Sequence, residues 1–241
     1  MSVVINTNVD SLKIQGLLTS STNKLSNSMQ RMSSGLKILS AKDDAAGTVI
    51  SAKMNVQLNG NQIAQKNVQN ANALLLTAEG NLDVIEDNIT RIRDLTLQAK
   101  NGTYSETEVQ AMQDEVDARL AEITRIQDSA KFNGIALFTA ADTGLGQAGL
   151  VLQVGANSDT NNQITAKNTI FQKLTNPTVD VKTAATTAIG NVDTALNTVV
   201  SKKADIGAVQ NRLSSAQASL VTSIENASAA KSTIMDADIS Q

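Results

Sequence analysis

The sequence lacks the side chains on which most enzyme active sites depend. Its 241 residues include no cysteine and no histidine, which excludes thiol nucleophiles, imidazole bases, disulfides and the usual zinc sites. It contains no glycine-rich phosphate loop, and no grouping of serine, lysine and acid can be singled out. We therefore expect no enzymatic activity, no metal and no cofactor.

Aromatic residues and long apolar runs are also scarce. Aromatics make up 2% of the chain, and tryptophan is absent, whereas ordinary cores and ligand pockets use large aromatic side chains. Hydrophobic residues still reach 41%, which suits a thin aliphatic seam between helices. No run approaches the roughly 20 apolar residues of a membrane span, and the N-terminus has no signal-peptide pattern. We expect no membrane partner.

The charges nearly balance, with 20 Lys and Arg against 23 Asp and Glu and no long block of one sign. Nucleic-acid binding usually needs a basic patch or stripe, so no nucleic-acid partner is expected. The missing cysteines leave the compartment open, because reduced cytosolic proteins and unstapled exported ones look alike in this respect.

Apolar residues spaced three and four apart predict long helices. The helices are expected at about residues 44–100, 105–129 and 183–235, after an N-terminal helical segment. The most regular row is formed by Val68, Ala71, Leu75, Ala78, Leu82, Ile85, Ile89 and Ile92. At about 1.5 Å per residue the longest helix would extend roughly 85 Å, which predicts a rod.

The region of about residues 131–182 has a different character. Asn133-Gly134 is a turn signal, and Leu150 to Asn157 are typical of a strand followed by a turn. Polar residues and the single proline, Pro177, indicate surface loops. The predicted fold class is mainly α: an elongated antiparallel α-helical coiled-coil bundle with a small β-hairpin region.

The stretch from Arg31 to Gly47 contains features that end one helix and start another. Gly35 is expected to cap or loosen the first helix. Ser40 and Asp43 have the spacing of a helix-capping pair, and Asp44 would lie in the same first turn. A metal site would need further acidic ligands, and none is identifiable nearby, so capping is favoured.

Lys203, Gln210 and Gln217 occupy seam positions of the last helix. Such residues can specify the register or the partner of a helix pair, or they can lie at the exposed edge of a tilted seam; both interpretations stay open.

The tripeptides at Asn88, Asn101 and Asn226 match the N-glycosylation pattern, but two lie within predicted helices and are attributed to chance.

Several motifs resemble bacterial flagellin, in the order found in that family. They are VINTN, RMSSGLKILSAKDDAAG, TRIRDLTLQ, FNG, QVGAN, GAVQNRL and DADIS. The resemblance covers almost the whole chain. It implies a structural subunit that self-assembles into the flagellar filament for motility, whereas the helical periodicity by itself indicates only a rod.

The resemblance also implies a domain organisation. Residues 1–32 would form the N-terminal half of the inner coiled-coil domain, 33–43 a spoke linker, 44–235 the rod-like outer core domain and 236–241 the start of the C-terminal spoke. The inner coiled-coil seam would consist of Leu18, Leu25, Met29, Met32 and Leu36. The family usually continues past this point with a second inner helix, so we expect that the 241-residue chain alone does not build normal filaments.

Further partners follow from the resemblance. The chain would meet other copies of itself in a helical homopolymer, hook-associated and cap proteins, and the flagellar type III export apparatus. An export chaperone of the family binds the region that follows residue 241, so that partner is left open. The expected location is the extracellular filament, reached without a cleaved signal peptide. A hook-filament junction protein is the alternative.

Many flagellins are ligands of Toll-like receptor 5, and the family's receptor-contact pattern carries over to Arg91, Leu95 and Glu115, with Gln98 and Arg119 as neighbours. The sequence pattern places Leu95 on an exposed face, away from the buried row. A solvated face with a spare leucine is the interpretation that physical reasoning alone favours. The resemblance instead implies a receptor-binding surface.

Overall fold

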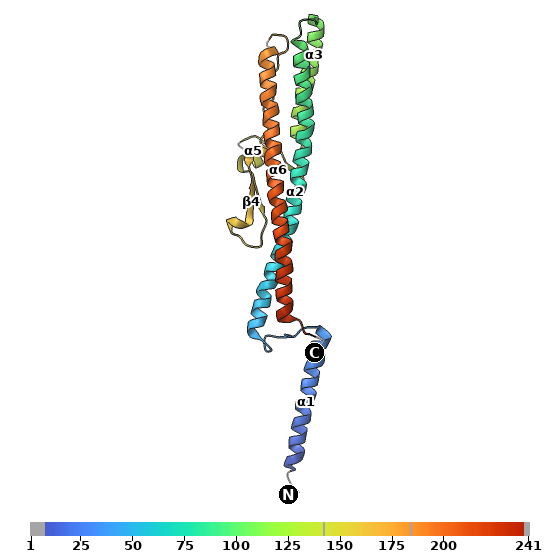
Figure 1. Cartoon of the computed structure of the whole chain (residues 1–241), viewed down its shortest axis with the longest axis vertical. Helices are drawn as coiled ribbons and strands as arrows, with labels where there is room; N and C mark the ends of the chain where they lie inside the picture. Colours follow the sequence, from blue (N-terminus) through green and yellow to red (C-terminus); the bar gives the residue numbers. More distant parts are fainter. Residues whose placement is uncertain (1–7, 142, 184, 239–241) are drawn as a thin grey trace. The chain divides into compact units, whose positions relative to one another are not determined.

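The structure is a computed structural model that describes residues 8–141, 143–183 and 185–238 (Figure 1). The predicted mainly α fold class is confirmed. The chain divides into two compact units, Gly60–Val221 and Met1–Asn59 together with Thr222–Gln241, which are described separately. The long helices are α1 (Val9–Ser34), α2 (Ala45–Ala99), α3 (Glu106–Ser129) and α6 (Ala185–Met235).

In the unit Gly60–Val221, helices α2, α3 and α6 pack around an aliphatic core. Every residue of the predicted row from Val68 to Ile92 is buried. Helix α2 contacts both of the others: Arg91 pairs with Glu115 on α3, and Arg93 Nε donates to Asp193 Oδ1 on α6 at 2.6 Å. Figure 1 shows the green α3 and the orange part of α6 beside α2.

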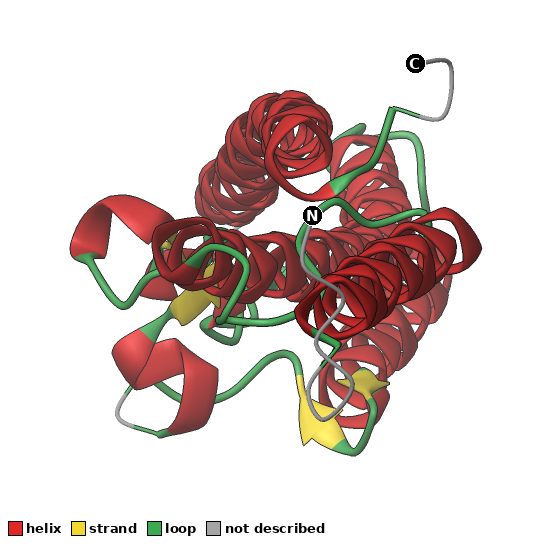
Figure 2. Ribbon diagram, turned by 90° about the horizontal axis from the view of Figure 1, so that it is seen from below, coloured by secondary structure: helices red, strands yellow, loops and turns green. Residues whose placement is uncertain are grey.

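Short elements connect α3 to α6 and lie outside the long helices (Figure 2). They are β1 (Lys131–Phe132), β2 (Ile135–Ala136), α4 (Gly144–Ala148), β3 (Leu150–Gln153), a 3-10 turn (Thr160–Asn162), β4 (Gln163–Ala166) and α5 (Asn168–Phe171). Two antiparallel pairs form, β1 with β2 and β3 with β4, the latter with Leu150 opposite Ala166 and Gln153 opposite Gln163. The β-hairpin region is therefore present.

The connecting region contributes more to the core than its polar composition indicated. Phe138, Ile170 and Phe171 are buried in the same cluster as the long helices. Pro177, expected in a surface loop, is also buried. Gly60 accommodates this packing, because a Cβ there would come within 2.7 Å of the Ala156 Cβ. The surface-loop expectation was wrong here since a few apolar side chains dock the segment on the helices.

In the other unit, α1 is followed by a turn that pairs with the chain after α6. The Lys37 N–H donates to the Met235 carbonyl at 2.7 Å, and the Ala237 N–H donates to the Gly35 carbonyl at 2.9 Å. Leu36 and Asp236 form an antiparallel bridge. The first seven residues of the expected 1–32 segment, and residues 239–241 of the expected C-terminal spoke, lie outside the described residues.

Candidate functional site

The sequence-predicted receptor-binding residues gather on one side of the α2–α3 pair. Four of them line a groove of about 310 Å³ bordered by Arg91, Leu95, Gln98, Tyr104, Glu108, Ala111, Met112 and Glu115, and the fifth, Arg119, hydrogen-bonds to Glu115. Helix α3 folds back along α2 because the α2–α3 turn is short and Ser105 caps α3. The Ser105 side chain accepts from the Glu108 N–H, and the Glu108 side chain accepts from the Ser105 N–H at 2.7 Å, which together form a capping box.

Two arginines share one carboxylate at the centre of this site. Arg91 Nε donates to Glu115 Oε1 at 3.1 Å, and Arg119 Nε donates to the same oxygen at 3.0 Å. Arg119 Nη1 also donates to Asn88 Oδ1 at 3.2 Å. The hydrogen bonds from Arg91 and then Arg119 hold the pKa of the Glu115 carboxyl below its usual value. The cluster therefore presents two cations and one anion at neutral pH.

Leu95 does not lie where the sequence pattern placed it. The residue is 2% exposed and belongs to the main hydrophobic cluster, so the expected exposed face was wrong at this position. The reason is that α2 is covered by both α3 and α6, which bury a wider arc than a single coiled-coil seam. Leu95 lines the groove as a buried residue.

Gln98 lies at the end of the groove nearest the α2–α3 turn. Its Nε2 donates to the Tyr104 hydroxyl at 2.8 Å, which ties the end of α2 to the segment before α3. Neither Tyr104 nor Asn88 was expected at this surface from the sequence. Their contacts with Gln98 and Arg119 could be found only once the register of α2 against α3 was known.

The turn between α1 and α2 uses the predicted residues in a different arrangement. Gly35 caps α1 in the left-handed conformation, with φ of 68°, as expected. Helix α2 starts after Asp44, whose Oδ1 accepts from the Gly47 N–H at 2.9 Å, so Asp44 takes the capping position that Ser40 was expected to hold. Ser40 and Asp43 instead close the preceding turn, where Asp43 Oδ2 accepts from the Ser40 and Leu39 N–H groups.

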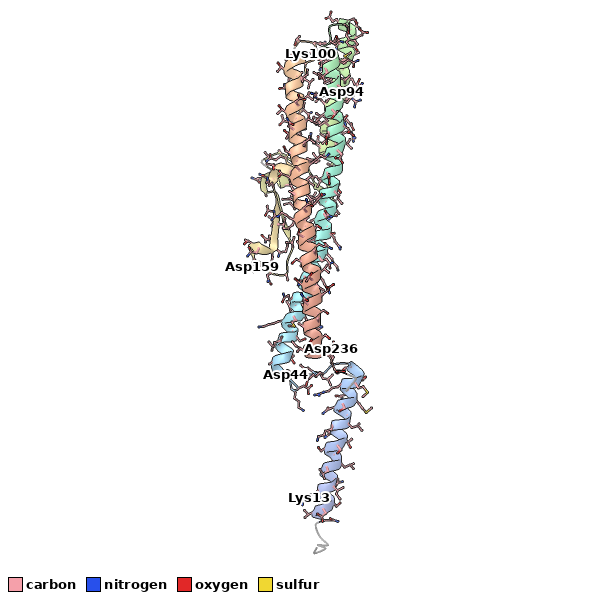
Figure 3. All side chains as sticks on the ribbon, viewed as in Figure 1. Lys13, Asp44, Asp94, Lys100, Asp159 and Asp236 are labelled. Atoms are coloured by element: carbon pink, nitrogen blue, oxygen red, sulfur yellow. The ribbon has the colours of Figure 1, made fainter. Side chains whose placement is uncertain are left out.

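Hydrogen bonds determine the ionisation of Asp43. Desolvation raises its pKa, but the bonds from Leu39 and Ser40 and the charge of Arg31 outweigh that effect and lower it. Arg31 Nη2 lies 3.7 Å from Asp43 Oδ1. Figure 3 shows Asp44 and Asp236 close to this turn. Of the adjacent acids Asp43 and Asp44, the first closes the turn and the second caps the start of α2.

Among the described residues of their unit, the seam residues of α1 are buried against no partner. Helix α1 has no buried residue, and Leu18, Leu25, Met29 and Met32 are each more than 60% exposed. Leu36, which was counted in the same seam, lies beyond the end of α1 at Ser34 and pairs with Asp236. A row of exposed apolar side chains of this length is typical of an interaction surface.

Comparisons with known proteins match both parts of the chain. A family model described as the bacterial flagellin N-terminal helical region matches residues 5–143, and one described as the bacterial flagellin C-terminal helical region matches residues 189–241. The chain belongs to the bacterial flagellin family. The sequence resemblance to flagellin is thereby confirmed.

The chain covers most of one relative in the flagellin family and little more than half of another. It is 34% identical over 252 residues to the flagellar filament 30.7 kDa core protein of Treponema maltophilum, covering 98% of this chain and 87% of that protein. It is 37% identical over 204 residues to flagellin of Serratia marcescens, covering 85% of this chain and 56% of that protein. The chain thus spans little more than half of the latter.

Two solved structures agree with the helical architecture. Flagellin of Bacillus cereus superposes with a TM-score of 0.54 at 31% identity, covering 64% of this chain and 88% of that chain. A flagellar hook-associated protein from Vibrio parahaemolyticus gives a TM-score of 0.65 at 16% identity, covering 80% and 100%. At that identity the second likeness concerns the fold alone.

The polar seam residues of α6 make specific contacts in this flagellin-family chain. Lys203 Nζ lies 2.7 Å from both Asp83 Oδ1 and Glu86 Oε2, and Gln210 Nε2 donates to Glu79 Oε2 at 3.0 Å. The contacts of Lys203 and Gln210 favour the interpretation that seam residues specify the register of the helix pair. They count against the interpretation that these residues lie at an exposed edge. Gln217 lines a small groove without such a partner on α2.

Within the described ranges, no group of three or more acidic, histidine or cysteine side chains is arranged to hold a metal ion. Among the helices that the structure describes, none combines the length and the apolarity of a membrane span. Two surfaces of this flagellin-family chain are candidates for function: the α2–α3 groove and the α1 row.

Proposed function

We propose that the chain is a structural subunit that polymerises into the bacterial flagellar filament. The observation that carries this proposal is α1: its 26 residues bury no side chain, yet they expose a row of large apolar side chains, Leu18, Leu25, Met29 and Met32. Helices of that kind gain most of their stability from packing against a partner. Other copies of the chain supply such partners in a helical homopolymer, located outside the cell.

Assembly can be tested by placing a charge on the α1 row of a chain that also carries the family's second inner helix. Leu25→Asp should abolish or strongly reduce polymerisation, because a carboxylate buried between helices without a partner costs several kcal/mol. Asn27→Asp is the matched control, since it adds the same charge about 200° around the helix from Leu25. Light scattering and electron microscopy after salt-induced assembly supply the readout, and equal filament yields from both variants would refute the role of this row.

The alternative is a hook-filament junction protein, supported by the fold likeness to a hook-associated protein. The same assembly experiment separates the two. A filament subunit elongates into long polymers, whereas a junction protein binds filament ends without elongating. In either role the proposed partners include the hook-associated and cap proteins and the flagellar type III export apparatus.

We also propose that the α2–α3 groove is a ligand surface for Toll-like receptor 5. The support is the convergence of Arg91, Glu115 and Arg119 beside Gln98 over a buried Leu95. An arginine held by a carboxylate loses less side-chain freedom on binding, and arginine is frequent among residues that dominate interface energies. Because Leu95 is buried, it does not insert into the receptor in this proposal.

Receptor activation by purified variants tests this second proposal. Arg91→Ala and Glu115→Ala should each weaken activation by about tenfold or more, as expected for central interface residues. Arg93→Ala is the matched control: it also removes an α2 ion pair, but one that faces α6. Circular dichroism should show equal helicity in all three. Equal activation by Arg91→Ala and Arg93→Ala would defeat the assignment.

A further inference from the structure

Three Asn-Gly pairs occur in the chain and lie in different kinds of backbone. They are Asn59–Gly60 inside α2, Asn101–Gly102 in the turn between α2 and α3, and Asn133–Gly134 in the hairpin between β1 and β2. An Asn-Gly dipeptide is chemically distinctive, because glycine has no Cβ to keep its main-chain nitrogen away from the asparagine side-chain carbonyl. That nitrogen can attack the carbonyl when the backbone is free to rotate.

Of the three Asn-Gly pairs, Asn101–Gly102 is the one that its surroundings constrain least. Both residues are exposed, and a Cβ added at Gly102 would meet nothing within 4 Å. The Asn101 N–H donates to the Gln98 carbonyl at 3.0 Å, but neither the Asn101 side chain nor the Gly102 N–H makes a hydrogen bond to any described residue. Figure 3 shows the labelled Lys100 at this end of α2.

We propose that Asn101 is the spontaneous deamidation site of this chain. The Gly102 main-chain nitrogen loses its proton to solvent and bonds to Asn101 Cγ. The Cγ–Nδ2 bond then breaks, and the amide nitrogen leaves as ammonia after taking up protons from water. Water adds to either carbonyl of the resulting cyclic imide and reopens it as aspartate or isoaspartate. The net change consumes one water and releases one ammonia, and it needs no oxidant, cofactor or enzyme.

The backbone of α2 protects Asn59. In a regular helix the Gly60 N–H is already committed to the main-chain carbonyl four residues earlier, so its nitrogen cannot approach the Asn59 side chain unless the helix opens locally. Gly60 is further confined, since its Cα faces Ala156 across a gap too small for a Cβ.

The hairpin constrains Asn133 in another way. Asn133 and Gly134 both have positive φ, 49° and 80°, as a tight two-residue turn requires. Phe132 pairs with Ile135 and Lys131 with Ala136 on either side of that turn. Rotating Asn133 to bring the Gly134 nitrogen onto its side chain would separate these pairs, so Asn133 should react more slowly than Asn101.

Deamidation of Asn101 would alter the connection between the two helices that bear the groove. It creates a carboxylate beside the C-terminal end of α2, where the helix dipole disfavours negative charge. The isoaspartate product also adds one carbon to the main chain between Gln98 and Tyr104, which are joined by a hydrogen bond. This chemistry is independent of both proposed functions and is testable on the purified chain.

The experiment compares the three sites within one protein. The full chain is held at mildly alkaline pH, and peptide mapping with mass spectrometry follows amide-to-carboxylate conversion at each asparagine, with an isoaspartyl methyltransferase assay for the branched product. Conversion at Asn101 should exceed that at Asn59 by at least about tenfold, which corresponds to about 1.4 kcal/mol of local opening. In concentrated urea the three rates should converge, because the protection comes from the fold.

Gly102→Ala provides the control variant. It should slow conversion at Asn101 while leaving Asn59 and Asn133 unchanged, and Gly102 lies in a turn where the added methyl group meets no neighbour. Comparable rates at Asn101 and Asn59 in the folded protein would overturn the proposal. So would faster conversion at Asn133, or a native Asn101 side chain found blocked by a glycan.

Discussion

Lys202 is a charged residue enclosed by main-chain carbonyls. Its side chain extends from α6, the residue is 7% exposed, and Nζ donates to the carbonyls of Thr169, Ile170 and Gln172. Burial lowers the pKa of Lys202 to about 8, against the opposing charge of Asp205. The ammonium attaches the α5 segment to α6, at the cost of removing a charge from water.

This burial predicts an unusual pH dependence of stability. Below about pH 8, Lys202 is protonated in both the folded and the unfolded chain. Between about 8 and 10.5, the folded chain binds fewer protons than the unfolded chain, so the free energy of unfolding rises with pH, by up to about 3 kcal/mol. Urea denaturation across this range should show the rise in the wild type and its loss in Lys202→Met.

Lys203 supplies the contrasting control. Hydrogen bonds that Lys203 donates to Asp83 and Glu86, together with the charges of these two carboxylates, raise the pKa of Lys203 above its ordinary value of 10.5. The contribution of Lys203 to the free energy of unfolding is therefore complete below about pH 10.5 and is lost only as the pH rises further. Lys203→Met should keep the rise that Lys202 produces. A rise that survives in Lys202→Met would contradict the assignment.

Single residues were also where sequence reasoning failed. Leu95 is one position from Thr96, and both are buried, because two helices cover α2 from different directions. Ser40 and Asp44 carry equally good helix-start signals, and only the folded turn shows that Asp44 holds the cap. Local patterns specify which chemistry is available, whereas the choice between neighbouring positions depends on packing.

At the scale of elements, polar contacts set the register of α6 against α2. Arg93 faces Asp193, and Lys203, ten residues later on α6, faces Asp83, ten residues earlier on α2, as well as Glu86. The equal spacing means that one antiparallel alignment satisfies both contacts. A slip of one heptad would bring Lys203 either toward Arg93 or away from its two acids, while the aliphatic rows would still meet.

Charge reversal at this point tests the register. Lys203→Glu should lower the free energy of unfolding by about 1 to 2 kcal/mol, since partly exposed pairs contribute up to about 1 kcal/mol and the reversal adds repulsion from two carboxylates. Combining it with Asp83→Lys and Glu86→Lys should recover most of the loss. If urea denaturation gives additive effects for the three substitutions, the contacts do not specify the register.

The long helices could be predicted from the sequence because each carries one strong period. Helices α2, α3 and α6 begin and end within two residues of the predicted positions. The connecting region could not be predicted as well, since its strands are two to four residues long and its burial rests on scattered side chains. Ile170 and Phe171 enter the core through tertiary contacts that no local pattern encodes.

At the scale of the whole molecule, burial is distributed very unevenly. The core of the unit Gly60–Val221 includes α2, α3, α6 and the connecting segment, whereas α1 contributes nothing to any core. Among the described residues, α1 is supported mainly by local helix propensity, the Asn8 and Gly35 caps and the Arg31–Asp43 ion pair. Its 26 residues exceed the roughly 12 to 15 residues below which isolated helices are marginal.

Hydrogen exchange should report this difference directly. In the monomer, amides of α1 should exchange rapidly, while those of α2 around Leu75 and Leu82, which are 0% and 2% exposed, should exchange at rates set by global unfolding. In assembled filaments the protection of α1 should rise by at least about tenfold, because packing of its apolar row adds more than about 1.4 kcal/mol to local opening. Protection of α1 in the monomer equal to that of α2, or no gain on assembly, would mean that this row is not the surface that joins subunits.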